Sequence, residues 1–392
     1  MSTAPASTEP VLAESTKAAA TGNGGRPRVA VLFGGRSSEH AVSCVTAAGV
    51  LGHIDRDRYD VVPIGITKSG QWVQASADPS AWSLRGDMLP QVEPSEATVM
   101  LTETGAGHQL VVAAPNQVPL ELGTVDVVFP LLHGPFGEDG TVQGLLELSD
   151  TRYVGAGVLA SAVGMDKHYM KVVFEAAGLA VGPYIAVTDR QWSTDPQAVR
   201  ARVAKLGFPV FVKPARAGSS MGISKVDRPE DLDAAMSEAR VHDLKLVVEA
   251  GIVGREIECA VLQGRGTEAP RTSMPGEIAM ADATHAFYDF TAKYVQNDAV
   301  NLSCPADLPA EAAERIREQA ALAFEAVGGE GLSRVDFFYT ADGEILVNEI
   351  NTMPGFTPSS MYPQMWAASG IGYAELIDEL LQLALNRKTG LR

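Results

Sequence analysis

The sequence predicts an α/β protein that begins with an open, mainly parallel sheet. Three short apolar runs, at 28–33, 59–66 and 125–132, have the length and composition of buried strands. A helical pattern follows the first run and another follows the third, and strands that alternate with helices are typical of a parallel sheet. Ligands of such sheets gather at the carboxyl ends of the strands. Later strand pairs, within 208–226 and 334–350, add antiparallel sheets, so α+β structure is expected after the first domain.

The length and charge of the chain limit the number of domains and the kinds of partner that the protein can have. Its 392 residues exceed one ordinary hydrophobic core, so two or three domains are expected. A net charge of −17 argues against nucleic acid or an anionic membrane as a partner. It also requires that any phosphate ligand be held by a local cluster of positive charge. The longest apolar runs are too short to span a bilayer.

Cysteine usage and the first residues indicate where the protein works. Cys44, Cys259 and Cys304 are too few and too scattered for a disulfide or zinc framework, so a reducing compartment, the cytoplasm, is expected. Residues 1–26 are rich in Ala, Ser, Thr and Gly, and they contain no apolar core of signal-peptide length. We therefore predict a disordered tail there.

A stretch near the end of the sequence predicts a β-hairpin. Asp342-Gly343 is a strong signal for a two-residue turn, and alternating apolar runs flank it. If these two residues form the loop, counting back along both strands sets Asp336 opposite Glu349 and Arg334 opposite Asn351. All four of these side chains then share one face of the hairpin.

This polar face fits a divalent cation. Asp336 and Glu349 repel each other when they are directly opposite, unless a cation lies between them. Carboxylate oxygens, joined by the amide oxygen of Asn351, suit Mg²⁺ bound together with phosphate. The alternative is a solvated face on which Arg334 neutralises the two acids. An apolar opposite face favours the metal site, and its expected members are Val335, Phe337, Leu346 and Ile350.

Two glycine-rich loops fall at the carboxyl ends of predicted parallel strands. In the first, 34–40, Glu39 lies in the first turn of a helix, where the helix dipole favours a carboxylate. A purely structural turn between strand and helix explains this loop equally well. In the second, 133–140, His133 is the first residue after a buried strand. It either contacts a ligand or has a structural role, and the sequence alone leaves both open.

A third loop, 214–222, is rich in small residues and lies between two predicted antiparallel strands. The N–H groups of such a loop can close over phosphates. Lys213 ends the strand before it, and a buried ammonium there would need an anionic partner. An exposed lysine above an ordinary hairpin is the alternative.

Two further segments have the character of a nucleotide contact and of a lid. Glu249 and Glu256 bracket a short connection of the kind that contacts a base and a ribose. Glu256 and Glu258 alternate along the next predicted strand, a pattern that usually marks a solvated face. Residues 276–305 are long and weakly periodic, and the aromatic side chains clustered at 287–294 favour a lid.

These motifs occur in a specific order: GGRSSEHAVS (34–43), HGPFGEDG (133–140), MDK (165–167), FVKPARAGSSMG (211–222), FYDFTAKY (287–294), RVD (334–336) and NEINTMPG (348–355). In this order they resemble the ATP-grasp superfamily. In detail, the chain resembles the family of D-alanine–D-alanine ligases over about residues 27–388.

The resemblance implies a fold, a division into domains and a reaction. It implies an N-terminal open parallel α/β domain followed by a two-lobed ATP-grasp fold. The expected parts are a tail (1–26), the N-terminal domain (27–157), a central lobe (158–254) and a C-terminal lobe (255–392) with a lid at about 276–305. It implies ATP-dependent joining of two D-alanine molecules through a D-alanyl phosphate, for peptidoglycan precursor synthesis. Two Mg²⁺ (or Mn²⁺) ions and a homodimer are further implications.

The resemblance also assigns nucleotide and metal contacts. The expected ATP contacts are Lys167 and Lys213 on the phosphates, Ser219, Ser220 and Gly222 covering them, Glu249 and Ile252 at the adenine, Glu256 on the ribose and Lys293 reaching the γ-phosphate from the lid. The expected metal ligands are Asp336, Glu349 and Asn351.

The substrate contacts follow from the same resemblance. The first D-alanine is expected to bind through its ammonium to Glu39, with His133 nearby, and the carboxylate of the second to reach Ser360 and Met361. Arg334 and the Gly355 N–H would donate to the tetrahedral oxyanion. Glu39, Ser219 and Tyr294 would form a hydrogen-bonded bridge that joins the three domains over the closed site.

Two alternatives compete with this interpretation. A D-alanine–D-lactate ligase would keep the fold, but the lid at 287–294 has the form found in dipeptide ligases. A non-catalytic nucleotide-binding protein on the same fold is expected to lack a metal ligand or the arginine, and Arg334 and the predicted metal ligands are all present.

Overall fold

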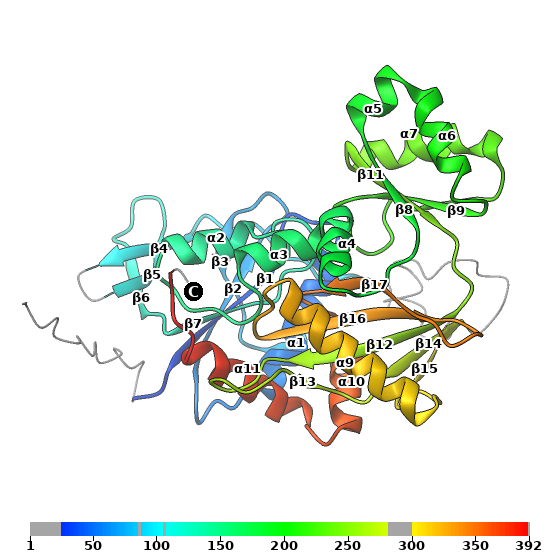
Figure 1. The fold of residues 1–392 in the computed structure, drawn as a ribbon. Helices are drawn as coiled ribbons and strands as arrows, with labels where there is room; N and C mark the ends of the chain where they lie inside the picture. The colour runs from blue at the N-terminus through cyan, green and yellow to red at the C-terminus, as the bar shows by residue number, and fades with distance from the viewer. Residues whose placement is uncertain (1–24, 85–87, 105–106, 281–299, 391–392) are drawn as a thin grey trace, which may run out of the picture.

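The protein consists of three groups of helices and strands (Figure 1). The structure, a computed structural model, describes residues 25–390 apart from 85–87, 105–106 and 281–299. An N-terminal sheet (blue to cyan), a set of green strands and helices, and a C-terminal sheet (yellow-green to orange) follow one another along the chain. No helix in the described ranges is both long enough and apolar enough to cross a membrane.

Two predicted features fall wholly or largely outside the described residues. One is the N-terminal tail, of which only the last two residues are described. The other is the central part of the lid, which includes Lys293 and Tyr294. The predicted domain boundaries remain a prediction.

The N-terminal sheet confirms the expected parallel arrangement. Its strand order is β3-β2-β1-β7; β1 pairs in parallel with β2 and with β7, and β3 is an antiparallel edge. Both faces of the sheet are buried, which explains why its strands are continuous apolar runs. The elements are β1 (Arg28–Gly34), α1 (His40–His53), β2 (Asp60–Ile66), β3 (Trp72–Gln74), a 3-10 turn (Pro79–Trp82), β7 (Val127–Pro130) and α2 (Thr141–Leu148).

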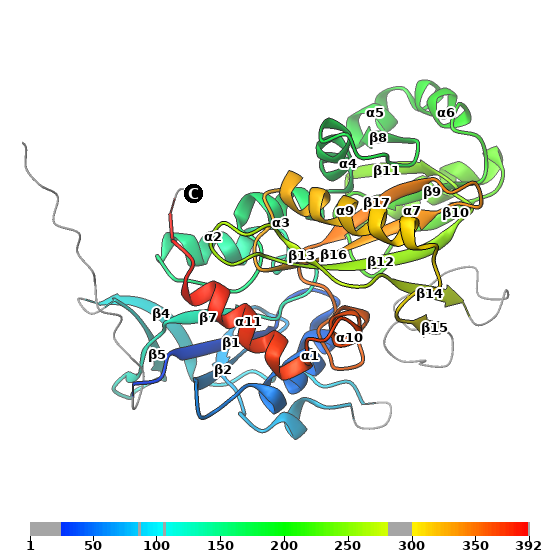
Figure 2. The ribbon, with the colours of Figure 1, turned by 60° about the horizontal axis from the view of Figure 1, so that its bottom comes forward.

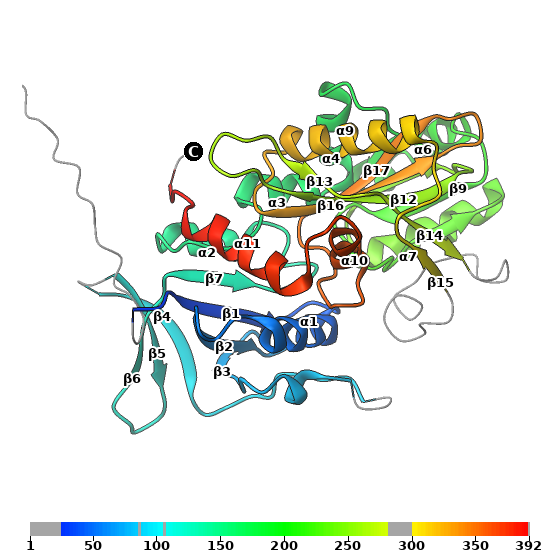
Figure 3. The same ribbon diagram turned by 90° about the horizontal axis from the view of Figure 1, so that it is seen from below.

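A second, antiparallel sheet was not predicted from the sequence. Its strands β4 (Thr98–Thr104), β5 (Gly107–Ala113) and β6 (Leu120–Thr124) pair in order and extend from one end of the parallel sheet (Figure 3). Val99 and Leu110 pack into the core that also contains residues of β1 and β2. The small sheet therefore covers part of the face of the parallel sheet that α2 leaves open.

The chain then enters two helices that meet at Asp166. Asp166 ends α3 (Val158–Met165), and its carboxylate accepts hydrogen bonds from the first N–H groups of α4 (Lys167–Ala176). This N-cap starts a new helix directly after α3. The cap also fixes Lys167 at the first position of α4.

The green region is a four-stranded antiparallel sheet with three helices. Its strand order is β10-β9-β11-β8, and the predicted strand–loop–strand is the β9–β10 pair, with Val212 opposite Ser224. The helices pack on one face and bury a separate core. Figures 1 and 2 show this region at one end of the molecule. The elements are β8 (Tyr184–Thr188), α5 (Asp189–Thr194), α6 (Pro196–Ala204), β9 (Val210–Pro214), β10 (Ser224–Val226), a 3-10 turn (Pro229–Asp231), α7 (Leu232–His242) and β11 (Lys245–Ala250).

The C-terminal sheet is also antiparallel. Its order is β15-β14-β12-β16-β17, with β13 paired to β12. Helices α4 and α9 pack on one face, where they bury a core with the sheet. The elements are β12 (Arg255–Leu262), β13 (Arg271–Thr272), β14 (Gly276–Met280), β15 (Val300–Ser303), α9 (Ala310–Ala326), β16 (Leu332–Tyr339), β17 (Ile345–Asn351), α10 (Met361–Ala368) and α11 (Tyr373–Leu385).

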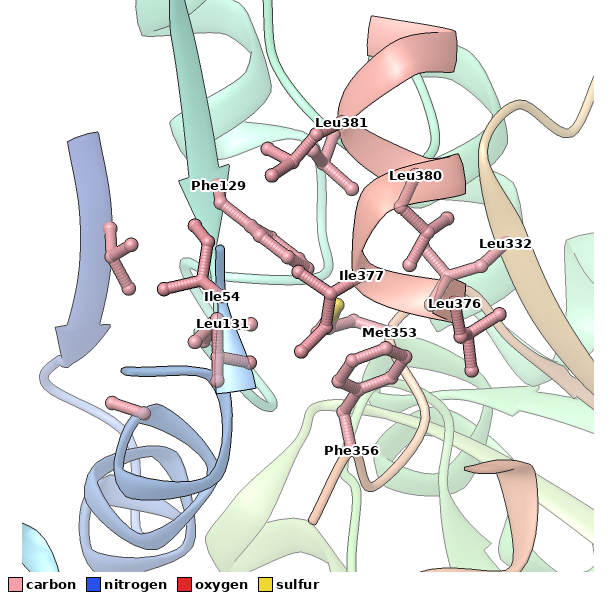
Figure 4. Close-up of a cluster of buried hydrophobic side chains, with 14 of the residues drawn as sticks. Ile54, Phe129, Leu131, Leu332, Met353, Phe356, Leu376, Ile377, Leu380 and Leu381 are labelled. Carbon is pink, nitrogen blue, oxygen red and sulfur yellow. The ribbon is translucent and has the colours of Figure 1, made fainter. Parts of the chain in front are cut away.

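The last helix returns to the first sheet. In Figure 4, Ile377, Leu380 and Leu381 of α11 lie against Phe129 and Leu131, and the cluster continues through Leu332, Met353 and Phe356. All of these side chains are at most 6% exposed. One hydrophobic core therefore joins the N-terminal sheet to the C-terminal sheet and to the loop after β17.

The β16–β17 hairpin confirms the predicted register at the site, although its turn differs from the prediction. Arg334 faces Asn351 and Asp336 faces Glu349. The turn contains three residues, because Thr340 and Glu344 pair through the Thr340 N–H and the Glu344 C=O, and only Gly343 has a positive φ. The predicted two-residue turn, as a type I′ loop, would need positive φ angles at both Asp342 and Gly343. Only Gly343 has one, so the predicted two-residue turn was wrong.

A bulge at Asn348 explains why the register is nevertheless right. Phe337 faces Val347, so one extra residue lies between this pair and the Asp336–Glu349 pair. The extra residue offsets the longer turn, and it also reverses the side-chain alternation in the outer part of β17. Ile345 and Val347 are therefore buried, and Leu346, predicted for the apolar face, is not in the core.

This reversal predicts which substitution in β17 is costly. Ile345→Ala should lower the free energy of unfolding by about 2–5 kcal/mol, as for other buried isoleucines. Leu346→Ala should cost roughly half of that or less, because its side chain is only partly buried. Urea unfolding of the two variants and the wild type compares them directly. A larger effect at Leu346 would support the uninterrupted register that a two-residue turn requires.

Candidate active site

Two adjoining cavities lie where the three regions meet. The larger has a volume of about 540 Å³ and the smaller about 260 Å³. They share Lys167, Ser219, Arg334 and Glu349 in their walls, so they form two parts of one site. The N-terminal sheet contributes to the larger cavity through Glu39, and the β9–β10 loop contributes to both.

Most of the predicted site residues line these cavities. Four predicted residues, Lys167, Ser219, Arg334 and Glu349, line both cavities. Of the other predicted residues, the larger cavity is lined by Glu39, Asn351, Gly355, Ser360 and Met361, and the smaller one by Lys213, Ser220, Glu249, Ile252, Glu256 and Asp336. His133 and Gly222 line neither cavity. Lys293 and Tyr294 lie outside the described residues. The geometry brings the other predicted positions together, and their roles remain predictions.

Gly222 has a structural reason to be glycine. Its φ is +69°, and a Cβ there would lie 2.3 Å from the His242 ring. Both the backbone conformation and the close approach exclude a larger residue. In this structure Gly222 shapes the end of the β9–β10 loop, while Ser219 and Ser220 face the cavities.

Three lysines lie at or beside the smaller cavity, together with the carboxylates that line it. Glu249, at the end of β11, accepts from Lys213 Nζ at 2.6 Å and from Lys171 Nζ at 3.1 Å. Burial alone would raise the pKa of Glu249, but the two ammonium groups outweigh it and hold this pKa at about 2. Lys167 adds a third buried ammonium, whose pKa burial lowers. Three lysines around one glutamate form the local positive cluster that a phosphate ligand needs in this acidic protein.

The hairpin face lies at the junction of the cavities. Arg334 donates to both oxygens of Asp336, at 2.7 Å each, and its Nε lies 3.1 Å from Glu258. Burial would lower the pKa of Arg334, but Asp336 and Glu258 outweigh it and raise this pKa well above its usual range. Arg334 therefore neutralises Asp336 in this structure, as the alternative interpretation of the hairpin expected. That contact and the predicted metal site are compatible, because a carboxylate has about four lone-pair sites.

Glu258 was missed as a site residue. The alternation of Glu256 and Glu258 predicted a solvated face, yet Glu258 is only 4% exposed and lines both cavities. It faces Asp336 across the β12–β16 ladder. Its burial follows from the strands on either side of β12, and no local sequence signal shows it. A charged residue opposite Asp336 could have been suspected only from the sheet order.

A hydrogen bond spans the gap between the N-terminal sheet and the β9–β10 loop. Ser219 Oγ donates to a carboxylate oxygen of Glu39. Glu39 precedes α1, is nearly buried, and lies so close to Gly134 that a Cβ there would come within 2.3 Å of Glu39 Oε2. The predicted contact between Glu39 and Ser219 is therefore confirmed. The Tyr294 part of the predicted bridge is not described.

His133 lies behind this carboxylate and contacts the protein through both ring nitrogens. Nδ1 is 3.1 Å from the carbonyl oxygen of Met353, so Nδ1 carries the proton, and Nε2 is 3.2 Å from the Thr46 hydroxyl. Burial lowers the pKa of His133, which favours the neutral ring. His133 thus connects β7 to the loop after β17.

Glu138 is a second site residue that sequence reasoning did not single out. It lines the larger cavity beside Glu39, and its Oε1 accepts from the Gly134 N–H at 2.7 Å. Burial, and then the charge of Glu39, raise the pKa of Glu138 to about 8. The HGPFGEDG motif contained it, but only the fold shows that its side chain turns toward Glu39.

The far end of the larger cavity is formed by the loop after β17. Asn351 Oδ1 accepts from the Met353 N–H at 3.1 Å, which fixes the start of this loop. Ser360 is the residue before α10, and its hydroxyl contacts Thr357 at 2.7 Å. Free N–H groups at the start of a helix favour an anion. Ser360 and the first turn of α10 therefore suit a carboxylate.

Solved structures share this fold. The "VanG D-Ala:D-Ser Ligase from Enterococcus faecalis" is 36% identical with a TM-score of 0.76, and the similarity covers 92% of this chain and 99% of that chain. The "D-alanine-D-alanine ligase from Coxiella burnetii" is 33% identical with a TM-score of 0.76, over 93% and 95% of the two chains. The fold and the site thus define an ATP-grasp protein with an N-terminal α/β domain, which confirms the predicted fold class.

Sequence comparison is more specific. Residues 28–156 match the family described as D-ala D-ala ligase N-terminus, and residues 173–382 match the D-ala D-ala ligase C-terminus. The D-alanine--D-alanine ligase of Arthrobacter sp. (strain FB24) is 79% identical over 367 residues, 94% of this chain and 96% of that protein. The chain belongs to the D-alanine–D-alanine ligase family, as the motifs predicted.

The raised pKa of Glu138 predicts a pH-dependent stability. The folded protein favours the protonated carboxyl, so its contribution to stability is complete below the ordinary carboxyl pKa of about 4.5 and is lost as the pH rises through about 8. Glu138→Gln keeps an oxygen for the Gly134 N–H and cannot ionise. The variant and the wild type should have similar melting temperatures near about pH 5, and the variant should melt higher near about pH 9. Calorimetry across this range tests it, and parallel pH profiles would contradict the argument.

Proposed function

We propose that this protein catalyses the ATP-dependent ligation of two D-alanine molecules to D-alanyl-D-alanine. One observation carries the proposal: a cavity that contains Lys213 and a cavity that contains Glu39 share Lys167, Arg334 and Glu349 in their walls. A nucleotide in the first and an amino acid in the second would bring a phosphoryl donor and a carboxylate together. Family membership, which implies the use of ATP and D-alanine, supports the assignment. The product would enter peptidoglycan precursor synthesis.

ATP would occupy the smaller cavity. Lys167 and Lys213 would contact its phosphates under the loop of Ser219, Ser220 and Gly222. The base would lie at the β11–β12 connection and the ribose at the start of β12. The proposed contacts there are Glu249, Ile252 and Glu256, and Lys293 would reach the γ-phosphate from the lid. The support is that the described members of this set, apart from Gly222, line one cavity beside the buried Lys171.

Magnesium or manganese would bind at the hairpin face. The residues fit such an ion, because the oxygen-only set of Asp336, Glu349 and Asn351 suits a hard cation that takes its remaining ligands from phosphate. Among the described residues, no group of three or more His, Cys, Asp or Glu side chains is placed to hold a metal ion. Two bound ions would neutralise the charge of the phosphates during transfer. Their number is part of the proposal.

The amino acids would occupy the larger cavity. The ammonium of the first D-alanine would lie at Glu39, and its carboxylate would face the γ-phosphate and become an acyl phosphate. The second D-alanine would place its carboxylate at Ser360 and Met361, and its amine would attack the acyl carbon. The resulting oxyanion would accept from Arg334 and the Gly355 N–H, and phosphate would leave. Water would hydrolyse the acyl phosphate, so closure of the cavity by the 276–305 segment has a chemical purpose.

The cellular setting is proposed on less specific grounds. We infer a cytoplasmic homodimer. The family resemblance supports the dimer. The compartment is supported by the thiols of Cys44 and Cys259, which are buried and unpaired as in proteins of reducing compartments.

The role of Arg334 can be tested without removing its charge. Arg334→Lys keeps a cation beside Asp336 and Glu258, but a lysine cannot make the forked contact. We expect kcat to fall about 10²–10³-fold, as for loss of one oxyanion donor, while the Kd for ADP stays close to that of the wild type. Steady-state kinetics and calorimetric titration measure the two quantities. An unchanged kcat would remove Arg334 from the chemical step.

The reaction itself is tested by phosphate release from Mg-ATP. With D-alanine alone we expect one phosphate for each dipeptide formed. Adding D-lactate or D-serine to the D-alanine reaction, with mass spectrometry of the products, tests whether either one is the preferred second substrate. If the mixed product dominates, the second substrate is D-lactate or D-serine instead of D-alanine. ATP binding without phosphate release under any of these conditions would leave a nucleotide-binding protein.

A further inference from the structure

Lys171 is buried beside the nucleotide cavity but has no part in the reaction as proposed. It lies one turn after Lys167 on α4 and is 2% exposed. Its Nζ is 3.1 Å from Glu249 Oε1 and 3.5 Å from the carbonyl oxygen of Asn348. It lines neither cavity of the site. Lys171 therefore cannot contact a nucleotide in these cavities from this position. Its positive charge instead neutralises the carboxylate of Glu249.

The Asn348 contact explains how this ammonium is held. Asn348 is the extra residue of the β17 bulge, and the extra residue of a bulge is left out of the strand ladder. Its carbonyl is therefore available to a donor from α4. The bulge that reverses the side-chain alternation of β17 thus also helps to anchor Lys171.

Lys213 faces two competing demands. In this structure its ammonium lies 2.6 Å from Glu249 Oε2, and Glu249 is 7% exposed. If Lys213 contacts the phosphates of ATP, its bond to Glu249 must weaken or break. A buried carboxylate left without a cation is strongly destabilising. Without a second cation, phosphate binding would carry this cost.

We propose that Lys171 is a positioning residue that holds the charge of Glu249, so that Lys213 is free to bind the phosphates of ATP. The inference rests on the proposed function, because it assumes that the smaller cavity takes a nucleotide. Lys171 suits the task because its two oxygen partners are both protein groups. The arrangement gives Glu249 one permanent cation and one that is shared with the ligand.

The proposal predicts a defect that depends on phosphate. Lys171→Met should weaken Mg-ADP binding about tenfold to a hundredfold, the range for loss of a charged hydrogen bond, because Lys213 must then remain with Glu249. Binding of adenosine, which has no phosphates, should change about twofold or less. Calorimetry for Mg-ADP and competition NMR for adenosine give the ratio of the two affinities. Lys171→Gln, which keeps a donor without the charge, should show the same loss and serves if the Met variant does not fold.

Two further variants separate charge from packing. Lys245 forms the other ion pair between this helix and β11, at 2.7 Å from Asp166 Oδ1, and it does not contact Glu249. Lys245→Met should leave the ADP-to-adenosine ratio within about twofold of the wild type, because it loosens the same helix without changing the charge at Glu249. Adding Glu249→Gln to Lys171→Met removes the competing carboxylate, so the ratio should return toward that of the wild type.

The outcomes distinguish this inference from the proposed function. A wild-type protein that binds neither Mg-ADP nor Mg-ATP would overturn the proposed function. A wild type that binds Mg-ADP, with Lys171→Met and Lys171→Gln keeping its affinity ratio, would overturn the role of Lys171 alone. Equal losses for ADP and adenosine, or the same loss in Lys245→Met, would also overturn it, since packing would then explain the effect.

Discussion

The site depends on keeping buried charges of like sign neutralised. Asp336, Glu258 and Glu349 lie on neighbouring strands of one sheet. Arg334 donates hydrogen bonds to Asp336 and forms an ion pair with Glu258. Removing one partner from such a buried set leaves an uncompensated charge, which costs several kcal/mol. The same rule governs Glu249 with its two lysines. The folded protein therefore holds, on two sheets and one helix, cations and anions that water would otherwise have to solvate.

Hydrophobic packing fixes where these charges lie. The core shown in Figure 4 ties the loop after β17 to the N-terminal sheet through Met353 and Phe356. The hydrogen bond from His133 to the Met353 carbonyl adds a directional contact across the same boundary. The larger cavity is thus lined by Glu39, in the loop after a strand of one sheet, and by the loop after a strand of another. Both parts are needed to form it.

Much of this could be predicted from the sequence, because the motifs are local and chemically specific. The parallel N-terminal sheet, the β9–β10 hairpin and the facing pairs of the β16–β17 hairpin follow from periodicity and turn residues. The facing pairs were right for an incomplete reason: a three-residue turn and a bulge offset each other. The prediction that Leu346 lies on the apolar face was wrong, because the direction of its side chain depends on the bulge. No signal in the chain marks a bulge at Asn348.

Burial that arises from sheet order was beyond sequence reasoning. Glu258 follows the pattern of a solvated strand face, and only its place between β14 and β16 buries it. Lys171 lies in an amphipathic helix where a lysine is ordinary, and its partner Glu249 is far away in the chain. Glu138 lay within a recognised motif, yet its orientation depends on the close approach of Gly134 to Glu39. The β4–β6 sheet was missed because its strands are partly polar.

The return of α11 to the first sheet has a consequence for how the chain folds. The face of β1 and β7 that carries Val29, Val31 and Phe129 is covered by residues 376–384, which lie far later in the chain. Contacts between residues so far apart in the sequence form late, and they make folding slow. A sheet that is only partly covered exposes apolar surface in the meantime. During synthesis, β1 and β7 therefore remain incompletely covered until α11 has been made.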